Sequence, residues 1–432
     1  MDFLVSAGGI ITMIISVFAI LAAIILNVRT GAVHFKLIGK IRTRSLSARG
    51  TAVASLGMGI GAQNIIAAVF AVTIFGAGAI FWLWVTALIM VAAGSSERTL
   101  AAYFRKINPD GKQTGGAYSY LRDGIGSRFG DILAVIFSFS SALFAIYGGG
   151  VLQAGAAAQA GEAFGFPTIA VPVILAAICA VMFFIGAKKS TLISGGVSAI
   201  AALLIIIASL GAIIANAEKL PEVLGSVFTS ILSVKSVLGG IFAGIFCSLA
   251  GFSANRMYTS DEPEPVASGS TAVGSVCISG IVIGTLAALG ALISGVGFNF
   301  GPTGALTFSD GGALYNVALI VSTLAAMLGW SAYGKELYTG KAKGDIGFAI
   351  IYLVATVCFA TREISAIWSI SLIFAAIILT VNLIGLLILS KTAAAVSRNY
   401  IKRRVNGDKT IQPMLSYYPD TQYELEKALE KE

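Results

Sequence analysis

The stretch "GMGIGAQN" at residues 57–64 interrupts an apolar run that continues as "IIAAVFAVTIFGAGAIFWLWV". Three glycines recur at every second position, and two amide side chains, Gln63 and Asn64, follow them. Each glycine costs a helix about 1 kcal/mol relative to alanine. Side-chain amides need hydrogen-bond partners wherever water is absent. The stretch therefore predicts a break inside a membrane helix, at which backbone groups become available for binding.

The composition is that of a polytopic helical membrane protein. Hydrophobic residues make up 57% of the 432 residues, charged residues make up 12%, and the mean hydropathy is +0.89. A soluble domain carries about twice this charged fraction. All four cysteines lie in apolar runs, which favours free buried thiols over disulfides. With a single histidine, the chain has no His/Cys cluster from which to build a metal site.

Apolar runs of spanning length predict an all-α fold with eleven transmembrane helices. The first run carries Asp2 where a signal peptide would carry basic residues, so we expect it to stay in the mature protein. The predicted spans are residues 5–27, 51–74, 79–97, 131–158, 168–186, 191–216, 237–254, 270–297, 313–334, 345–361 and 366–390.

The distribution of basic residues predicts the orientation of the chain. On this span assignment, 26 of the 29 Lys and Arg residues lie on one side of the membrane. Loops rich in Lys and Arg remain in the cytoplasm, so we expect the N-terminus outside and the tail, residues 391–432, inside. The net charge of +8 then reflects this positive-inside bias, with attraction to anionic head groups of the lipid bilayer as a secondary effect, and no nucleic-acid partner is predicted. The polar tail is expected to be partly disordered.

A second apolar span degrades into small and polar residues at "LAGFSAN", residues 249–255. The two interrupted spans are the first members of two sets of five, 51–216 and 237–390, which follow an extra helix and basic loop at 1–50. Broken helices at matching positions are typical of 5+5 inverted-repeat secondary transporters. In such sites helix-start N–H groups favour carboxylates, and freed carbonyls favour cations. Packing is the alternative, because Gly57 and Gly61 also form a small-xxx-small pair.

Four further stretches, together with the first break, resemble the alanine or glycine:cation symporter family, whose members share a neurotransmitter:sodium symporter-like architecture. The stretches are "GAGAIFWLWVTALI" (76–89), "GGAYSYL" (115–121), "LGWSAYGKE" (328–336) and "NLIGLLILS" (382–390). The resemblance implies a secondary-active importer of small neutral amino acids such as glycine or alanine, coupled to a cation.

The resemblance also implies site residues. The backbone at Gly61, Ala62 and Gln63 would cradle the substrate carboxylate, with Asn64 beside it. The remaining implied residues are Gln153, Gly251, Phe252 and Trp330 for the substrate, and the backbone of Gly57 and Ile60 for a cation. The alternative role for Gln153 is a helix–helix hydrogen bond, and the alternative for Trp330 is packing.

Departures from the family pattern leave the coupling ion open. Gln63 stands where the family has glycine, and Asp261 replaces its asparagine. The hydroxyl pair expected to help hold Na⁺ reads Ala325–Ala326, although hard cations need oxygen ligands. Proton coupling or uncoupled transport is therefore a rival. However, Glu97, Asp261 and Glu262 fall at predicted cytoplasmic ends, where we expect solvated loop charges.

The sequence gives less support to other classes of function. An intramembrane enzyme needs a nucleophile with a base, or paired acids, and no span carries a histidine or such a pair. A channel would show a charged ring or a filter-like repeat, and a transceptor has no specific mark in the tail. We expect no enzymatic activity and no cofactor apart from Na⁺ or H⁺ as coupling ion. The oligomeric state is open and compatible with a monomer.

Overall fold

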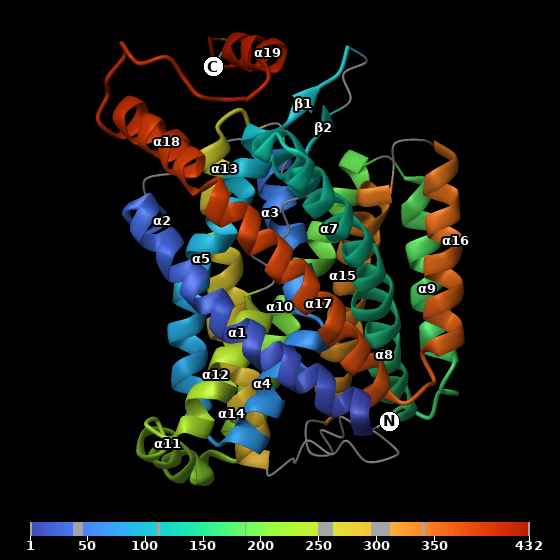
Figure 1. Cartoon of the computed structure of the whole chain (residues 1–432). Helices are drawn as coiled ribbons and strands as arrows, with labels where there is room; N and C mark the ends of the chain where they lie inside the picture. Colours follow the sequence, from blue (N-terminus) through green and yellow to red (C-terminus); the bar gives the residue numbers. More distant parts are fainter. Residues whose placement is uncertain are drawn as a thin grey trace.

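The computed structural model describes residues 2–37, 46–109, 113–185, 187–248, 262–294, 312–338 and 342–430 (Figure 1). Helices dominate the described residues, with short 3-10 or π-helical segments labelled η. In chain order, the elements are α1 (Asp2–Thr30), α2 (Val33–Lys36), α3 (Leu46–Gly59), α4 (Ala62–Phe75), α5 (Ala79–Tyr103), β1 (Lys106–Ile107), β2 (Gln113–Thr114), α6 (Ala117–Ser119), η1 (Tyr120–Gly124), α7 (Arg128–Ile146), η2 (Tyr147–Val151), α8 (Leu152–Glu162), α9 (Ala170–Phe184), α10 (Ala187–Ala215), η3 (Ala217–Lys219), α11 (Leu220–Thr229), α12 (Val234–Cys247), α13 (Pro265–Val276), η6 (Cys277–Ile283), α14 (Gly284–Ser294), α15 (Gly312–Tyr338), α16 (Ala342–Phe359), α17 (Ile364–Ile388), α18 (Ser390–Tyr400), η7 (Ile401–Val405) and α19 (Pro419–Glu430).

Six of the described helical stretches are long and apolar enough to cross a bilayer. Two bent helix pairs also qualify when each pair counts as one span, and three shorter apolar helices cover Ile14–Thr30, Ala170–Phe184 and Ile346–Phe359. Each of the eleven predicted ranges contains a helix among the described residues. The multi-pass helical class predicted from composition is confirmed. The six spans are Ala79–Tyr103, Arg128–Glu162, Lys189–Ala215, Pro265–Ile293, Ala313–Lys335 and Ile364–Ile388.

The helix predicted to break does so at Ile60 and Gly61. α3 ends at Gly59, α4 begins at Ala62, and the two axes are bent by 46°. Gly61 has an extended backbone, with φ −73° and ψ −171°, so the helical hydrogen-bond pattern stops there. The second predicted break, 249–255, lies outside the described residues.

The broken helix lies inside the bundle. α3 packs against α10, α13 and α15, and α4 packs against α12 and α14. α5 runs along both α12 and α13, whereas α9 and α16 pair at one edge of the molecule (Figure 1). Unwound backbone is tolerated at membrane depth only when protein or a cavity surrounds it. This enclosure therefore explains how the sequence can keep an interrupted helix in an apolar protein.

The C-terminal tail is folded over one end of the bundle, beside the antiparallel pair β1–β2 (Figure 1). Glu264 accepts hydrogen bonds from Arg403 and Arg404 of η7, with closest distances of 2.6 and 3.0 Å. The expected partial disorder does not extend over this segment, because α18, η7 and α19 lie within it. The tail closes over the end of the bundle at which α5 finishes.

Further contacts hold the tail to neighbouring loops. The Tyr417 N–H donates to the Tyr103 carbonyl at 2.8 Å, and the Ile107 N–H donates to the Thr421 hydroxyl at 3.0 Å. The Tyr418 hydroxyl donates to Asp123. Burial raises the pKa of Asp123, but hydrogen bonds from Arg122 and Tyr418 outweigh this effect and leave the pKa below its ordinary value. The hydrogen bond that Tyr418 of the tail donates to Asp123 therefore weakens only at an acidic pH, at which the Asp123 carboxylate becomes protonated.

Candidate functional site

Two amide side chains that follow the break cap the helix that precedes it. The last carbonyls of α3 have no partners within the helix. Gln63 donates from Nε2 to the carbonyl of Met58, and Asn64 donates from Nδ2 to the carbonyl of Gly59 at 2.5 Å. Both side chains are buried, with exposures of 1% and 0%. The amides that made the sequence unusual therefore satisfy the backbone groups that the break exposes.

Gln153 joins the break from a second helix. Its Oε1 accepts a hydrogen bond from the Ala62 N–H at 2.8 Å, at the first residue of α4. Its Nε2 donates to the Gly148 carbonyl at 2.8 Å and to Oε1 of Gln63. Gly148 belongs to the π-helical segment η2, where the spacing of carbonyls departs from that of α7 and α8. A side-chain oxygen thus already accepts a hydrogen bond from an N–H group at the start of α4.

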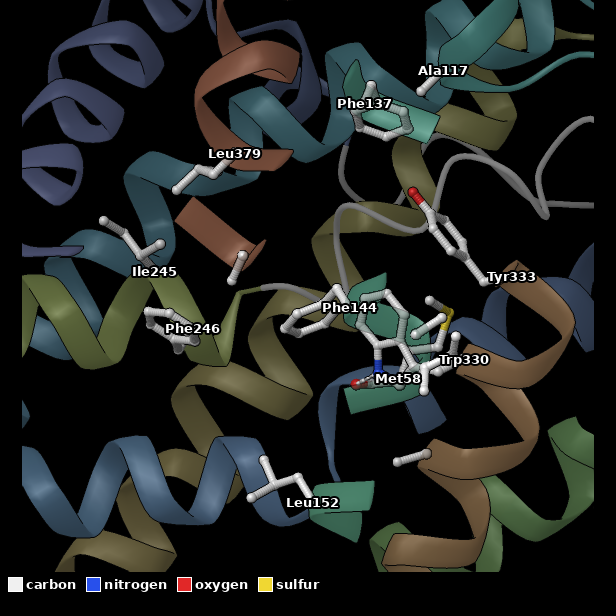
Figure 2. Close-up of a cluster of buried hydrophobic side chains, with 14 of the residues drawn as sticks. Met58, Ala117, Phe137, Phe144, Leu152, Ile245, Phe246, Trp330, Tyr333 and Leu379 are labelled. Carbon is white, nitrogen blue, oxygen red and sulfur yellow. Dashed lines mark hydrogen bonds between the residues drawn. The ribbon is translucent and has the colours of Figure 1, made fainter. Parts of the chain in front are cut away.

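Trp330 on α15 covers the break from the other side. Its indole N–H donates to the Met58 carbonyl at 3.1 Å, and its ring meets Phe144 edge-on at a centroid distance of 4.7 Å (Figure 2). The backbone of Gly149 approaches this side chain so closely that an added methyl group would lie 2.2 Å from the Trp330 Cβ. A residue larger than glycine at 149 would therefore push α15 away from the break.

Asn64 extends the site toward residues that the sequence did not single out. Its Nδ2 also donates to the Ser279 carbonyl at 2.8 Å, and the Cys247 thiol donates to Oδ1 at 2.6 Å. Cys247 was predicted to be a small buried hydrophobe, and its burial is confirmed. Its position two residues before "LAGFSAN" was the available signal that it adjoins the second interrupted span.

Around Gly57 the structure brings together several oxygen atoms. The Ile60 N–H reaches the Gly57 carbonyl at a long 3.4 Å. A methyl group built on Gly57 would lie 2.2 Å from the Ser198 hydroxyl oxygen and 3.1 Å from the Ala325 carbonyl oxygen. Ser198, on α10, is a residue that sequence reasoning missed. The available signal was the adjacent "SGG" at 194–196, since small residues mark a close helix approach.

The remaining predicted site residues fall into two groups. Ala325 and Ala326 are fully buried, and Ala326 faces Gly61, where an added methyl group would lie 2.5 Å from the Ala326 Cβ. Gly251, Phe252 and Asp261 lie outside the described residues. Thus Gly61, Ala62, Gln63, Asn64, Gln153 and Trp330 meet at one place.

The expectation that Glu97 and Glu262 are solvated loop charges was wrong. Glu97 has an exposure of 0%, and Glu262 an exposure of 7%. The predicted span ended at residue 97, but α5 continues to Tyr103 through "TLAAY", so Glu97 lies within the helix. Its Oε2 accepts a hydrogen bond from Asn382 Nδ2 at 2.8 Å. The apolar residues after Arg98 were the overlooked signal.

One family model matches most of the chain, and several transporters are similar to it. The model of the sodium:alanine symporter family matches residues 3–413. The sodium/alanine symporter AgcS of Methanococcus maripaludis is 26% identical over 376 residues, covering 81% of this chain and 83% of that protein. The amino-acid carrier protein AlsT of Bacillus subtilis is 25% identical over 374 residues, covering 81% and 79%. A solved manganese transporter of Eremococcus coleocola aligns with a TM-score of 0.48 and 14% identity, covering 89% and 83%.

Proposed function

The chain belongs to the sodium:alanine symporter family, and we propose that it imports glycine or alanine by alternating access, coupled to Na⁺. The observation that carries the proposal is the enclosed helix break at Ile60–Gly61, to which Gln63, Gln153 and Trp330 contribute polar groups. An interrupted helix in a transporter exposes backbone groups for a charged substrate at the membrane midplane.

The proposed architecture has eleven transmembrane helices. An extra N-terminal helix and basic loop, 1–50, precede two inverted five-helix repeats at 51–216 and 237–390. Basic loops and the tail, 391–432, face the cytoplasm, and the N-terminus faces outward. The chain would work in the cell membrane, and nothing in this scheme requires more than a monomer.

The substrate carboxylate would bind at the start of α4. In the structure the Ala62 N–H donates to the amide oxygen of Gln153. This oxygen takes the place that one oxygen of the substrate carboxylate would occupy. In the proposed exchange, the substrate carboxylate takes this N–H group together with those of Gly61 and Gln63. The released Gln153 oxygen then accepts a hydrogen bond from the substrate ammonium group. The partial positive charge of the helix start favours the carboxylate.

Sodium would bind on the opposite side of the break. The proposed ligands are the carbonyl oxygens of Gly57, Ile60 and Ala325 and the hydroxyl oxygen of Ser198. The short approach of Ser198 and Ala325 to Gly57 supports this assignment. Ser198 would supply a side-chain oxygen in place of the hydroxyl groups that Ala325 and Ala326 lack.

The test is binding of radiolabelled glycine and alanine to the purified protein, with sodium or with potassium in its place, at two pH values. Binding that strengthens with sodium, and uptake that concentrates the substrate in proteoliposomes, are the expected results. Binding that ignores sodium but follows pH would favour the alternative, a proton-coupled or uncoupled carrier of the same fold. The absence of binding to any neutral amino acid would refute the proposed function.

Gln63→Gly is expected to shift selectivity from glycine toward alanine. The Gln63 side chain fills the break between Met58 and Gln153, so its removal opens space next to Gly61. A buried methyl group contributes about 0.8 kcal/mol, which corresponds to an increase of about fourfold in the preference for alanine. Competition between the two amino acids in the binding assay measures this ratio, and an unchanged ratio would show that Gln63 does not face the substrate.

A further inference from the structure

A buried acid, Glu97, lines one cavity with Trp330 and is not among the residues that meet at the helix break. Glu97 of α5 accepts a hydrogen bond from Asn382 of α17, and Asn382 accepts one from the Tyr120 hydroxyl of η1. All three side chains are buried, with exposures of 0%, 2% and 0%. Side chains from three segments that are far apart in the sequence thus form one chain of hydrogen bonds that ends at the acid.

Glu97 lines a cavity that Trp330 separates from the break. It is lined by α5, α7, α15 and α17 and has a volume of about 20 Å³ for the centre of a water molecule, enough for about one water. Trp330 lines the cavity and also donates to Met58 at the break. In Figure 2 the Tyr333 hydroxyl points from α15 toward Phe137, and both residues line the cavity.

The groups around Glu97 favour a proton over a metal cation. Among the described lining residues, side-chain oxygens come from Glu97, Tyr333 and Asn382, and Asn382 already accepts from Tyr120. A hard cation requires more oxygen ligands than these. A proton requires one carboxylate oxygen and access to water, and the cavity provides both. Ionisable residues within a membrane bundle commonly mark proton or ion pathways.

The other ionisable groups near Glu97 come from three elements. Tyr120 of η1 interacts electrostatically both with Glu97 and with Tyr333 of α15, and Arg98 interacts electrostatically with Glu97. Arg98 follows Glu97 on α5, and its guanidinium group donates to Ser55 of α3 at 2.9 Å and to Thr271 of α13 at 2.7 Å. α7 contributes the apolar side chains Phe137 and Phe144 to the cavity, and α17 contributes Asn382 with apolar residues.

We propose that Glu97 carries a proton between the substrate site and the cytoplasm, so that the chain moves a proton together with its amino acid. In the proposed cycle the carboxylate binds a proton from water that has entered the cavity past the break. When the inner end opens, water hydrates the carboxyl group, and the proton leaves to the cytoplasm. Glu97 lies about 27 Å along α5 from Ala79. On the proposed topology this position is in the cytoplasmic half of the helix.

The inference rests on the proposed transport function and holds whether or not sodium is also carried. Its test uses the full chain in proteoliposomes with equal sodium and equal potassium on both sides, so that no sodium gradient drives uptake, and with an acidic outside. One proton per substrate supports accumulation of about tenfold per pH unit. The wild type should accumulate alanine toward this limit. Glu97→Gln should exchange internal for external alanine at the wild-type rate but lose the accumulation.

The control is Glu162→Gln, which removes a different carboxylate, an exposed one at the end of α8. It should accumulate alanine like the wild type. Asn382→Ala keeps the carboxyl group but removes its hydrogen-bond donor, and should shift the pH profile of accumulation. Asn382→Ala replaces Glu97→Gln as the test variant if thermal unfolding shows that Glu97→Gln does not fold.

Two results would overturn the proton role alone. One is acid-driven accumulation of alanine by folded Glu97→Gln. If that variant does not fold, the corresponding result is an unshifted pH profile of accumulation in Asn382→Ala. The other is a wild type that exchanges alanine yet shows no acid-driven accumulation. A wild type that neither binds nor exchanges any neutral amino acid would overturn the transport function itself, and this inference with it.

Discussion

Replacing Gln153 by alanine is expected to weaken amino-acid binding about five- to thirty-fold. In the proposed exchange, Gln153 gives up its hydrogen bond with Ala62, at a cost of about 0.5–1.5 kcal/mol, and gains one with the charged ammonium group, worth about 1.5–3 kcal/mol. The variant avoids this cost but also loses the hydrogen bond to the ammonium group. Because that hydrogen bond is worth more than the one given up, affinity falls by about 1–2 kcal/mol.

Equilibrium binding of radiolabelled alanine measures this change. Gln159→Ala is the matched control, because it removes the same type of side chain from α8, about 1.7 helical turns nearer the end of the helix. Its affinity should equal that of the wild type. Thermal unfolding of both variants separates a lost contact from a lost fold. Tighter binding by Gln153→Ala would mean that Gln153 merely competes with the substrate for the Ala62 N–H.

Gly61→Ala is expected to abolish detectable uptake. The backbone conformation of Gly61 suits any residue, so the effect arises from space alone. An added methyl group would lie 2.5 Å from both the Ala326 Cβ and the Gln153 Oε1, and 2.8 Å from the Gln63 Oε1. Overpacking of this kind costs about 1–3 kcal/mol, and relief requires either α15 or the two amides to move.

A second substitution can reveal which neighbour causes the loss. Ala326→Gly removes the methyl group that Gly61→Ala would meet, so the double variant should recover part of the uptake. A double-mutant cycle on uptake and thermal unfolding gives the coupling between the two positions. Gly196→Ala, where an added methyl group has open space within 4 Å, is the control. Equal uptake by Gly61→Ala and the control would show that the break is looser than the structure indicates.

Local signals in the sequence predicted the helix break well. Glycines at alternate positions and the amides of Gln63 and Asn64 act within a few residues, and the break occurs at Ile60–Gly61. Gln153 and Trp330 were predicted only through the family resemblance, and the structure places both at the break. Nothing in their own neighbourhoods specifies that they meet there.

Contacts between distant segments were not predictable in this way. Cys247 and Asn64 are 183 residues apart, and Asn382 and Glu97 are 285 apart. Such pairs depend on helix packing, which hydrophobic periodicity does not specify. Glu97 was misplaced for a simpler reason, since a hydropathy boundary stops at the first charged residue. A charged side chain with a buried partner lets the helix continue beyond it.

The docked tail imposes an order on biosynthesis. Ile107 and Thr421, which share a hydrogen bond, are separated by 314 residues. Ribosomes add about 5–20 residues per second, so the earlier strand waits about 16–63 s for its partner. Glu264 likewise precedes Arg403 and Arg404. During translation this end of the bundle therefore stays open to chaperones and proteases, and it closes only when the final residues emerge.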